Sequence, residues 1–205
     1  SSFIFETLEK ENVITQGVHK DINSQTGRAY IYLENNGESA ITILPGANGS
    51  LSPEDVLNRQ HLFHNAGYCL LSAELTLPVI SEAAKIGKQY GAKNILKPAA
   101  LKTLPEELIR NIDILVPNRK EASTLCPQCQ TIEEQAEYFF HKGIETVIIT
   151  LGHEGCYLKT AETTKYFPAA KFTSIDTTGG ADAFISALAA YLIDGRPPEK
   201  AIEIA

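Results

Sequence analysis

The chain has 205 residues, of which 43% are hydrophobic and 21% charged, and this composition is typical of one globular domain with a substantial core. The formal net charge of −7 argues against a nucleic-acid surface or an anionic membrane as the main partner. The apolar runs are too short to cross a bilayer, and the first residues lack the basic and apolar regions of a signal peptide. We therefore expect a soluble protein located in the cytoplasm.

The first 45 residues predict a short helix followed by strands. Residues 3–12 have the pattern of an amphipathic helix, and Asn36-Gly37 can supply a tight hairpin turn. Alternation of apolar and polar residues indicates a half-exposed sheet that forms a β flap over residues 13–45. The β-like runs of this flap are 13–20, 27–35 and 39–44.

From residue 45 onward, short apolar runs alternate with helical stretches. The expected strands are 66–74, 92–99, 113–118 and 145–152, and the expected helices are 77–91, 103–112, 119–125 and 131–143. Strand-then-helix repetition predicts an α/β fold with a parallel sheet covered on both faces. Ligands of such sheets bind beyond the carboxyl ends of the strands, so polar residues at those ends are the first candidates for a site.

The stretch IDTTGGADAF, residues 175–184, is a glycine-rich turn that opens an apolar helix. Such a turn exposes backbone N–H groups beside the positive end of the helix dipole, which favours a phosphate. A carboxylate there repels an anion, but Asp182 could take a proton from a hydroxyl that attacks the phosphorus. The alternative is structural: Asp182 complements the dipole, and Asp176 or a threonine caps the helix.

Two other places combine polar residues with the end of a predicted strand. Thr150 ends one strand and is followed by Gly152 and Gly155, which are spaced as in a tight turn. Asn118 and Glu121 lie on one face if a helix begins after Pro117. The alternative interpretation of the Thr150 motif is an ordinary β-hairpin. For Asn118 and Glu121 the alternative is a solvated helix start.

Four cysteines, Cys69, Cys126, Cys129 and Cys156, are too few for a disulfide framework in a chain of this length, and we expect reduced thiols. CPQC at 126–129 has the spacing of a redox motif or half of a zinc site, but the sequence holds no second half. A thiol-redox protein is a third, weaker hypothesis.

The order NxxE, TLGxxG and DTTGxxDAF resembles the ribokinase family, also called the phosphofructokinase-B-like (PfkB) carbohydrate kinases. The resemblance implies a three-layer α/β/α sandwich with a mostly parallel central sheet and a small β-sheet lid, which often forms a homodimer contact. Residues 1–205 would then be a single domain, with 13–45 as part of the lid.

The resemblance also implies roles for individual residues. Asp182 would be the general base and would contact the acceptor hydroxyl, and the backbone amides of Gly179, Gly180, Ala181 and Asp182 would form an anion hole. Asn118 and Glu121 would place Mg²⁺ and the phosphates of ATP, largely through water. The remaining implied residues are Thr150, Gly152 and Gly155 for the nucleotide, Glu74 for the sugar, and Asp176 and Thr178 for a monovalent cation such as K⁺.

The expected function is therefore ATP-dependent phosphorylation of a hydroxyl on a small sugar. A nucleoside kinase and a non-catalytic member that binds nucleotide or sugar are the alternatives. Ala181 departs from the family, where glycine is common, and a positive φ there would cost about 1 kcal/mol or more. The chain contains no Met, lacks the family's opening sugar-binding segments and stops within residues 197–205, so we expect it to be incomplete at both ends.

Overall fold

The computed structural model describes residues 2–33, 39–171 and 178–205. Its main sheet has six strands in the order β3-β4-β5-β6-β7-β8. The first four strands pair in parallel, and β7 and β8 add to the edge in antiparallel fashion. The strands are β3 (Tyr68–Ser72), β4 (Lys93–Lys97), β5 (Ile114–Leu115), β6 (Thr146–Thr150), β7 (Cys156–Lys159) and β8 (Thr164–Phe167).

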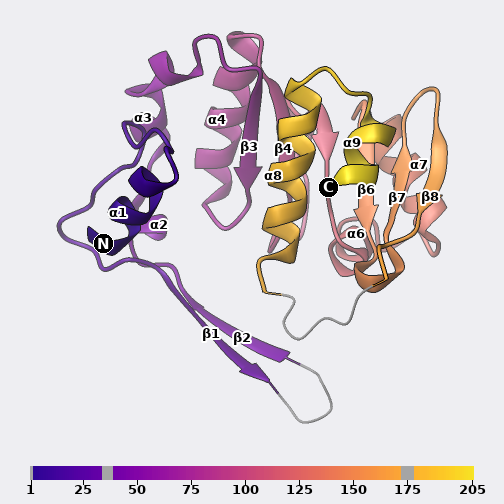
Figure 1. Ribbon diagram of the computed structural model, residues 1–205, viewed down its shortest axis with the longest axis horizontal. Coiled ribbons are helices and arrows are strands. Elements are labelled where there is room, and N and C mark those ends of the chain that lie inside the picture. Colours follow the sequence, from indigo (N-terminus) through magenta and orange to yellow (C-terminus); the bar gives the residue numbers. More distant parts are fainter. Residues whose placement is uncertain (1, 34–38, 172–177) are drawn as a thin grey trace.

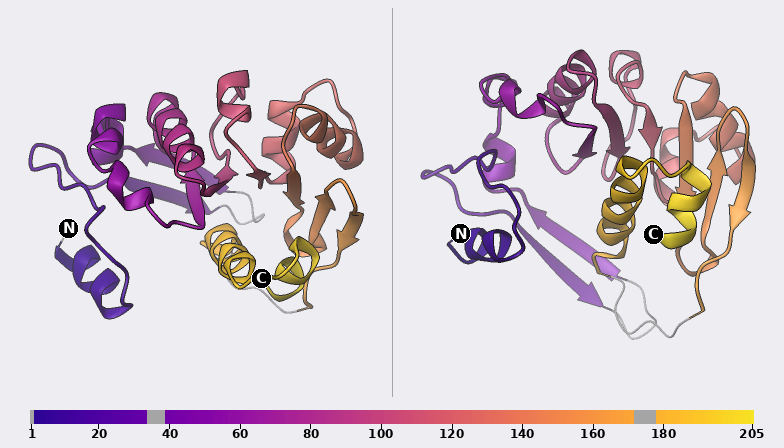
Figure 2. Two further views of the ribbon diagram at one scale, coloured as in Figure 1. Left: turned by 90° about the horizontal axis from the view of Figure 1, so that it is seen from above. Right: turned by 45° about the horizontal axis from the view of Figure 1, so that its top comes forward.

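Helices occupy both faces of this sheet, as the view from above shows (Figure 2). The α-helices are α1 (Ser2–Lys10), α2 (Ala47–Ser50), α3 (Pro53–Leu57), α4 (Leu77–Gln89), α5 (Glu106–Ile109), α6 (Arg119–Leu125), α7 (Ile132–His141), α8 (Gly180–Ile193) and α9 (Pro198–Ile204). Two short 3₁₀ turns, η1 (Gln60–Phe63) and η2 (Gly152–Glu154), complete the described elements.

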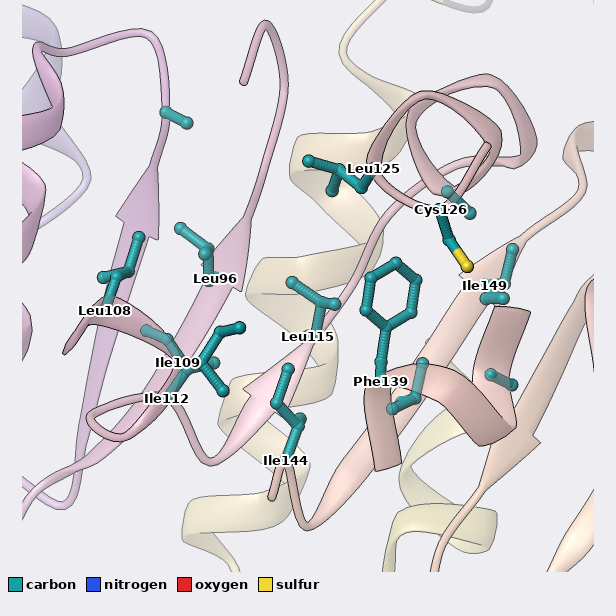
Figure 3. Close-up of a cluster of buried hydrophobic side chains, with 14 of the residues drawn as sticks. Leu96, Leu108, Ile109, Ile112, Leu115, Leu125, Cys126, Phe139, Ile144 and Ile149 are labelled. Atoms are coloured by element: carbon teal, nitrogen blue, oxygen red, sulfur yellow. The ribbon is translucent and has the colours of Figure 1, made fainter. Parts of the chain in front are cut away.

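Successive residues of a strand point to opposite faces of the sheet, and helices cover both faces of its central strands β4, β5 and β6. Leu96 and Leu115 join a core cluster with Phe139 of α7, and Figure 3 shows these side chains packed together. Ile95 and Ile114, one residue earlier on the same strands, instead pack in a second cluster with Leu188 of α8. The two clusters confirm the predicted three-layer α/β/α sandwich, with all the predicted strands and helices from residue 66 to residue 143 in place.

A two-stranded antiparallel sheet, β1 (Arg28–Leu33) and β2 (Ser39–Leu44), projects from the body of the molecule (Figure 1). The predicted hairpin is therefore present, while its turn at Asn36-Gly37 lies outside the described residues. The prediction of a strand at 13–20 is wrong. That segment forms turns, one closed by the Val18 N–H and the Thr15 carbonyl at 2.9 Å, and its His19 lies against Asp55 of α3 instead of pairing with a strand.

No helix in the described part of the chain is both long enough and apolar enough to cross a membrane.

Candidate active site

The carboxyl ends of the four parallel strands meet at one edge of the sheet, and the amino-terminal end of α8 and helix α6 lie at this edge (Figure 1). The motifs singled out in the sequence follow β5, follow β6 and open α8. Topology therefore brings segments that are far apart in the sequence to the same side of the molecule, as expected for an α/β sheet.

Asn118 and Glu121 form a reciprocal cap at the start of α6. The Asn118 side-chain oxygen accepts the Glu121 N–H at 2.8 Å, and the Glu121 carboxylate accepts the Asn118 N–H at 2.8 Å and its Nδ2 at 2.9 Å. This capping box satisfies donors that the first helical turn would otherwise leave free. The Glu121 side chain is only 13% exposed, whereas Arg119 and Lys120 in the same turn are exposed, so the alternative of a solvated helix start does not hold for Glu121.

Thr150 lies beside this cap. A parallel bridge joins Asn118 to Thr150, and the Thr150 N–H donates to the Pro117 carbonyl at 2.9 Å. Arg119 of α6 also pairs with Glu154 of η2 at 2.7 Å, although both side chains are more than half exposed and such a pair contributes little stability. The NxxE and TLGxxG motifs are thus neighbours in space.

Gly152 and Gly155 bracket the turn between β6 and β7. Both have positive φ, 62° and 105°, and the Gly155 carbonyl accepts the Leu151 N–H at 2.8 Å. Since β6 and β7 are antiparallel neighbours, the hairpin interpretation of this motif is correct. A Cβ on Gly155 would lie 1.9 Å from the Phe167 carbonyl oxygen, so this position requires glycine.

Lys97, the last residue of β4, is a member of the site that the motifs did not reveal. Its ammonium group forms an ion pair with Glu121, and the two side chains are 14% and 13% exposed. The signal available in the sequence was a charged residue at the carboxyl end of a strand whose preceding three residues are buried.

The start of α8 is built around Gly179. This residue has φ 77°, the left-handed conformation that favours glycine, and it has no side chain with which to cap the helix. The Ala183 N–H makes the first helical bond, to the Gly179 carbonyl at 2.9 Å, so the preceding amides of the first turn lack helical acceptors. Gly180 through Asp182 are exposed residues.

Ala181 is not among the residues with positive φ and occupies the first turn of α8. The family departure noted at this position therefore carries no backbone strain. Asp182 is exposed in the same turn, and Thr178 directly precedes Gly179, the N-cap residue of the helix. Asp176 falls outside the described residues.

The candidate residues form two groups. Asn118, Glu121 and Thr150 lie together at the ends of β5 and β6, and Asp182 opens α8. Alternation along β6 places Thr150 on the face of Ile148, which packs with α8. Glu74 is exposed in the turn after β3, two strands away from β5, and α8 packs against β3. The structure therefore brings Asn118, Glu121 and Thr150 together.

The donors at this edge fit Mg²⁺ held through water. The Glu121 carboxylate is an oxygen ligand of the kind that Mg²⁺ prefers, but Asn118 and Lys97 already contact its oxygens. No cluster of three or more His, Cys, Asp or Glu side chains that could hold a metal directly occurs among the described residues.

The cysteines depart from the expectation of reduced thiols. Cys126 and Cys129 are joined by a disulfide in the turn that ends α6, where their Cα atoms are 5.6 Å apart, a separation common in disulfides. Cys69 and Cys156 are free, and burial raises the pKa of each thiol to about 11. Both free thiols therefore stay protonated at neutral pH.

Comparisons with known proteins identify the family and support the fold. The model of the pfkB family carbohydrate kinases matches residues 1–205. A ribokinase from Staphylococcus aureus is 36% identical over 94% of this chain, and the chain spans 64% of that relative's length. Among solved structures, a ribokinase from Thermotoga maritima has 31% identity and a TM-score of 0.86, with 98% of this chain and 66% of that chain covered.

A third similar protein is the Arabidopsis thaliana ribokinase, whose structure is complexed with ribose and ATP. Its identity is 30% and its TM-score 0.78, with 91% of this chain and 64% of that chain covered. The family model covers the chain from its first residue to its last, and the relatives agree with it in both sequence and fold. The chain therefore belongs to the pfkB family of carbohydrate kinases.

Proposed function

We propose that the protein catalyses the ATP-dependent phosphorylation of a hydroxyl group on a small sugar. The observation that carries this proposal is the start of α8, where Gly179 precedes amides that lack helical acceptors and the carboxylate of Asp182 stands in the same turn. Backbone amides of a first helical turn suit a phosphoryl group, and a carboxylate beside them suits the removal of a proton from the attacking hydroxyl. The similarity to ribokinases, one of them complexed with ribose and ATP, supports the choice of sugar and ATP.

In the proposed reaction, the sugar hydroxyl oxygen bonds to the γ-phosphorus of ATP while the bond from that phosphorus to the β–γ bridging oxygen breaks. ADP leaves with that electron pair, and the Asp182 carboxylate accepts the hydroxyl proton. The backbone amides of Gly179, Gly180, Ala181 and Asp182 stabilise the negative charge on the transferred group.

The second group of residues would hold the nucleotide. Asn118 and Glu121 would hold Mg²⁺ through water, and the metal would supply positive charge to the phosphates. The surface of the β6–β7 turn would contact the nucleotide through Thr150, Gly152 and Gly155. Glu74 would contact the sugar.

The proposal extends to a cation and to a partner. Asp176 and Thr178 would bind K⁺ next to the anion hole. The β1–β2 sheet would serve as a lid and as a homodimer contact in the cytoplasm, which is consistent with apolar side chains that are strongly exposed on it: Tyr32 at 61%, Ile41 at 57% and Ile43 at 60%.

The experiment is a measurement of ADP release by the full-length protein with ribose, deoxyribose, fructose, ketodeoxygluconate or nucleosides as acceptors, in Mg²⁺ with and without K⁺. Asp182→Asn should lower turnover by roughly 10²–10⁴-fold and leave ATP binding intact, because it removes only the proton acceptor. Asp194→Asn is the matched control, since Asp194 caps the far end of the same helix and pairs with the exposed Arg196.

Three results would contradict the proposal. Turnover that survives in Asp182→Asn would exclude Asp182 as the base. Phosphorylation of nucleosides alone would make the protein a nucleoside kinase. Binding of ATP with no phosphorylated acceptor would favour a non-catalytic binding protein.

A further inference from the structure

The ion pair between Lys97 and Glu121 is far less exposed to solvent than the second ion pair that strand β4 makes, between Lys93 and Glu145. It is formed by two side chains that are each less than 15% exposed, whereas Lys93 at the other end of β4 pairs with Glu145 at 3.2 Å with exposed fractions of 54% and 64%. Strand β4 thus carries one partly buried pair at the candidate site and one solvated pair away from it.

Glu121 does not need Lys97 to keep its place. Asn118 already gives two hydrogen bonds to its carboxylate, and Glu121 returns one through its N–H. An ion pair withdrawn from water also loses much of its Coulombic gain to desolvation, so apolar replacements of such pairs are often equally stable. Holding the helix cap is therefore a poor explanation for a lysine at this position.

What Lys97 does change is the charge of the site. Without it, Glu121 would be an uncompensated carboxylate at the edge of the sheet beside Asn118 and Thr150, where the nucleotide phosphates are proposed to lie. A bare carboxylate attracts a free divalent cation and repels a polyphosphate. A lysine in contact with it weakens both effects.

We propose that Lys97 is a positioning residue that neutralises Glu121, so that the site accepts a nucleotide polyphosphate and discriminates against a free divalent metal. The inference rests on the proposed function for the location of the nucleotide. It adds a residue whose role depends on charge and acts through Glu121, not through contact with the reacting atoms.

Two binding measurements on the full-length protein test this role without using turnover. One is the affinity for ADP in the absence of metal, by calorimetry, and the other is the affinity for Mn²⁺ alone, by electron paramagnetic resonance. In Lys97→Met the affinity for ADP should fall about tenfold and that for Mn²⁺ should rise about tenfold, the size expected when one charge a few ångströms away is removed in a partly solvated site. Lys97→Arg keeps the charge and should restore both values to near those of the wild type.

Lys93→Met is the matched control, because it removes the same charge from the same strand at the exposed pair, and it should change neither affinity. If Lys97→Met fails to fold, Glu121→Gln tests the same idea from the other partner: Mn²⁺ should bind more weakly and metal-free ADP more tightly. Unchanged affinities together with a lower melting temperature would make the pair purely structural and overturn the inference. Changes of both affinities in the same direction would overturn it as well.

The two proposals can fail separately. If the wild type phosphorylates a sugar but Lys97→Met binds ADP and Mn²⁺ normally, only the inference about Lys97 fails. If the two affinities move in opposite directions but no acceptor is phosphorylated, the charge role stands and the catalytic proposal fails. Absence of any ADP binding by the wild type would overturn both.

Discussion

The two glycines of the β6–β7 turn provide a sharp test of how this part of the site is built, because replacing each by alanine should have very different costs. Gly152 has φ 62° and open space around the position of a Cβ. Gly152→Ala should therefore cost only the strain of the left-handed conformation, about 1 kcal/mol.

Gly155 has φ 105° and ψ −133°, a region that is essentially restricted to glycine. Its Cβ would also lie 1.9 Å from the Phe167 oxygen, more than 1 Å inside the 3.0 Å limit for real Cβ contacts, and 2.7 Å from the Ala169 nitrogen. Both neighbours are backbone atoms, so the chain at the end of β8 must move. Strain and overpacking together give about 3 kcal/mol or more.

Thermal unfolding followed by far-UV circular dichroism measures both costs. For a domain of this size, 1 kcal/mol corresponds to a change of about 2–4 °C in the melting temperature, so Gly155→Ala should melt roughly 10 °C below the wild type and Gly152→Ala only about 3 °C below it. Equal costs for the two variants would refute the conclusion that Gly155 is required by the close approach of β8.

Three further predictions concern other positions. Ala181→Gly should lower the unfolding free energy by roughly 0.5–1 kcal/mol without raising turnover, because Ala181 already has helical backbone; a large gain in turnover would show that its Cβ obstructs the phosphate. Cys69 and Cys156 should resist alkylation by iodoacetamide at pH 8 in the folded protein, and fast alkylation would contradict this. The stability of the fold should also decrease as the pH rises from about 9 toward 11, because the thiols of the unfolded chain ionise near the ordinary pKa of 9.0 while those of the folded protein keep their protons to about 11. Gly87→Ala should lower the unfolding free energy by about 2 kcal/mol, because the new Cβ would lie 2.3 Å from Oδ1 of Asn94. Asn94 cannot easily move away, since its buried Nδ2 donates to two backbone carbonyls. A melting temperature equal to that of the wild type would contradict this prediction.

The strands of the main sheet could be predicted because both of its faces are covered. In β6, residues 146–149 are all buried, and residues 147–149 form the continuous β-branched apolar run that is expected of a strand covered on both faces. The helix at 119–125 was equally predictable, since Asn118 and Glu121 have the spacing of a capping box.

The segment at 13–20 shows where such reasoning fails. Alternation of apolar and polar residues favours a strand only if a neighbouring strand offers its backbone groups. The segment instead turns at Thr15 to Val18 and places His19 3.6 Å from the Asp55 carboxylate. Its apolar residues stay largely exposed, with Ile14 at 79%, so the pattern did not reflect burial.

The same distinction separates the motifs from Lys97. NxxE acts within one helical turn, so spacing alone predicts its hydrogen bonds. Lys97 and Glu121 are 24 residues apart and meet only because β4 and β5 are parallel neighbours whose carboxyl ends share an edge. A charge at the last position of a buried parallel strand therefore has a restricted set of partners, namely the helix starts and turns that follow adjacent strands. For this chain, Glu121 in the first turn of α6, which follows β5, belongs to this restricted set, so the charge of the proposed nucleotide site depends on a strand end and a helix start that no single motif encodes.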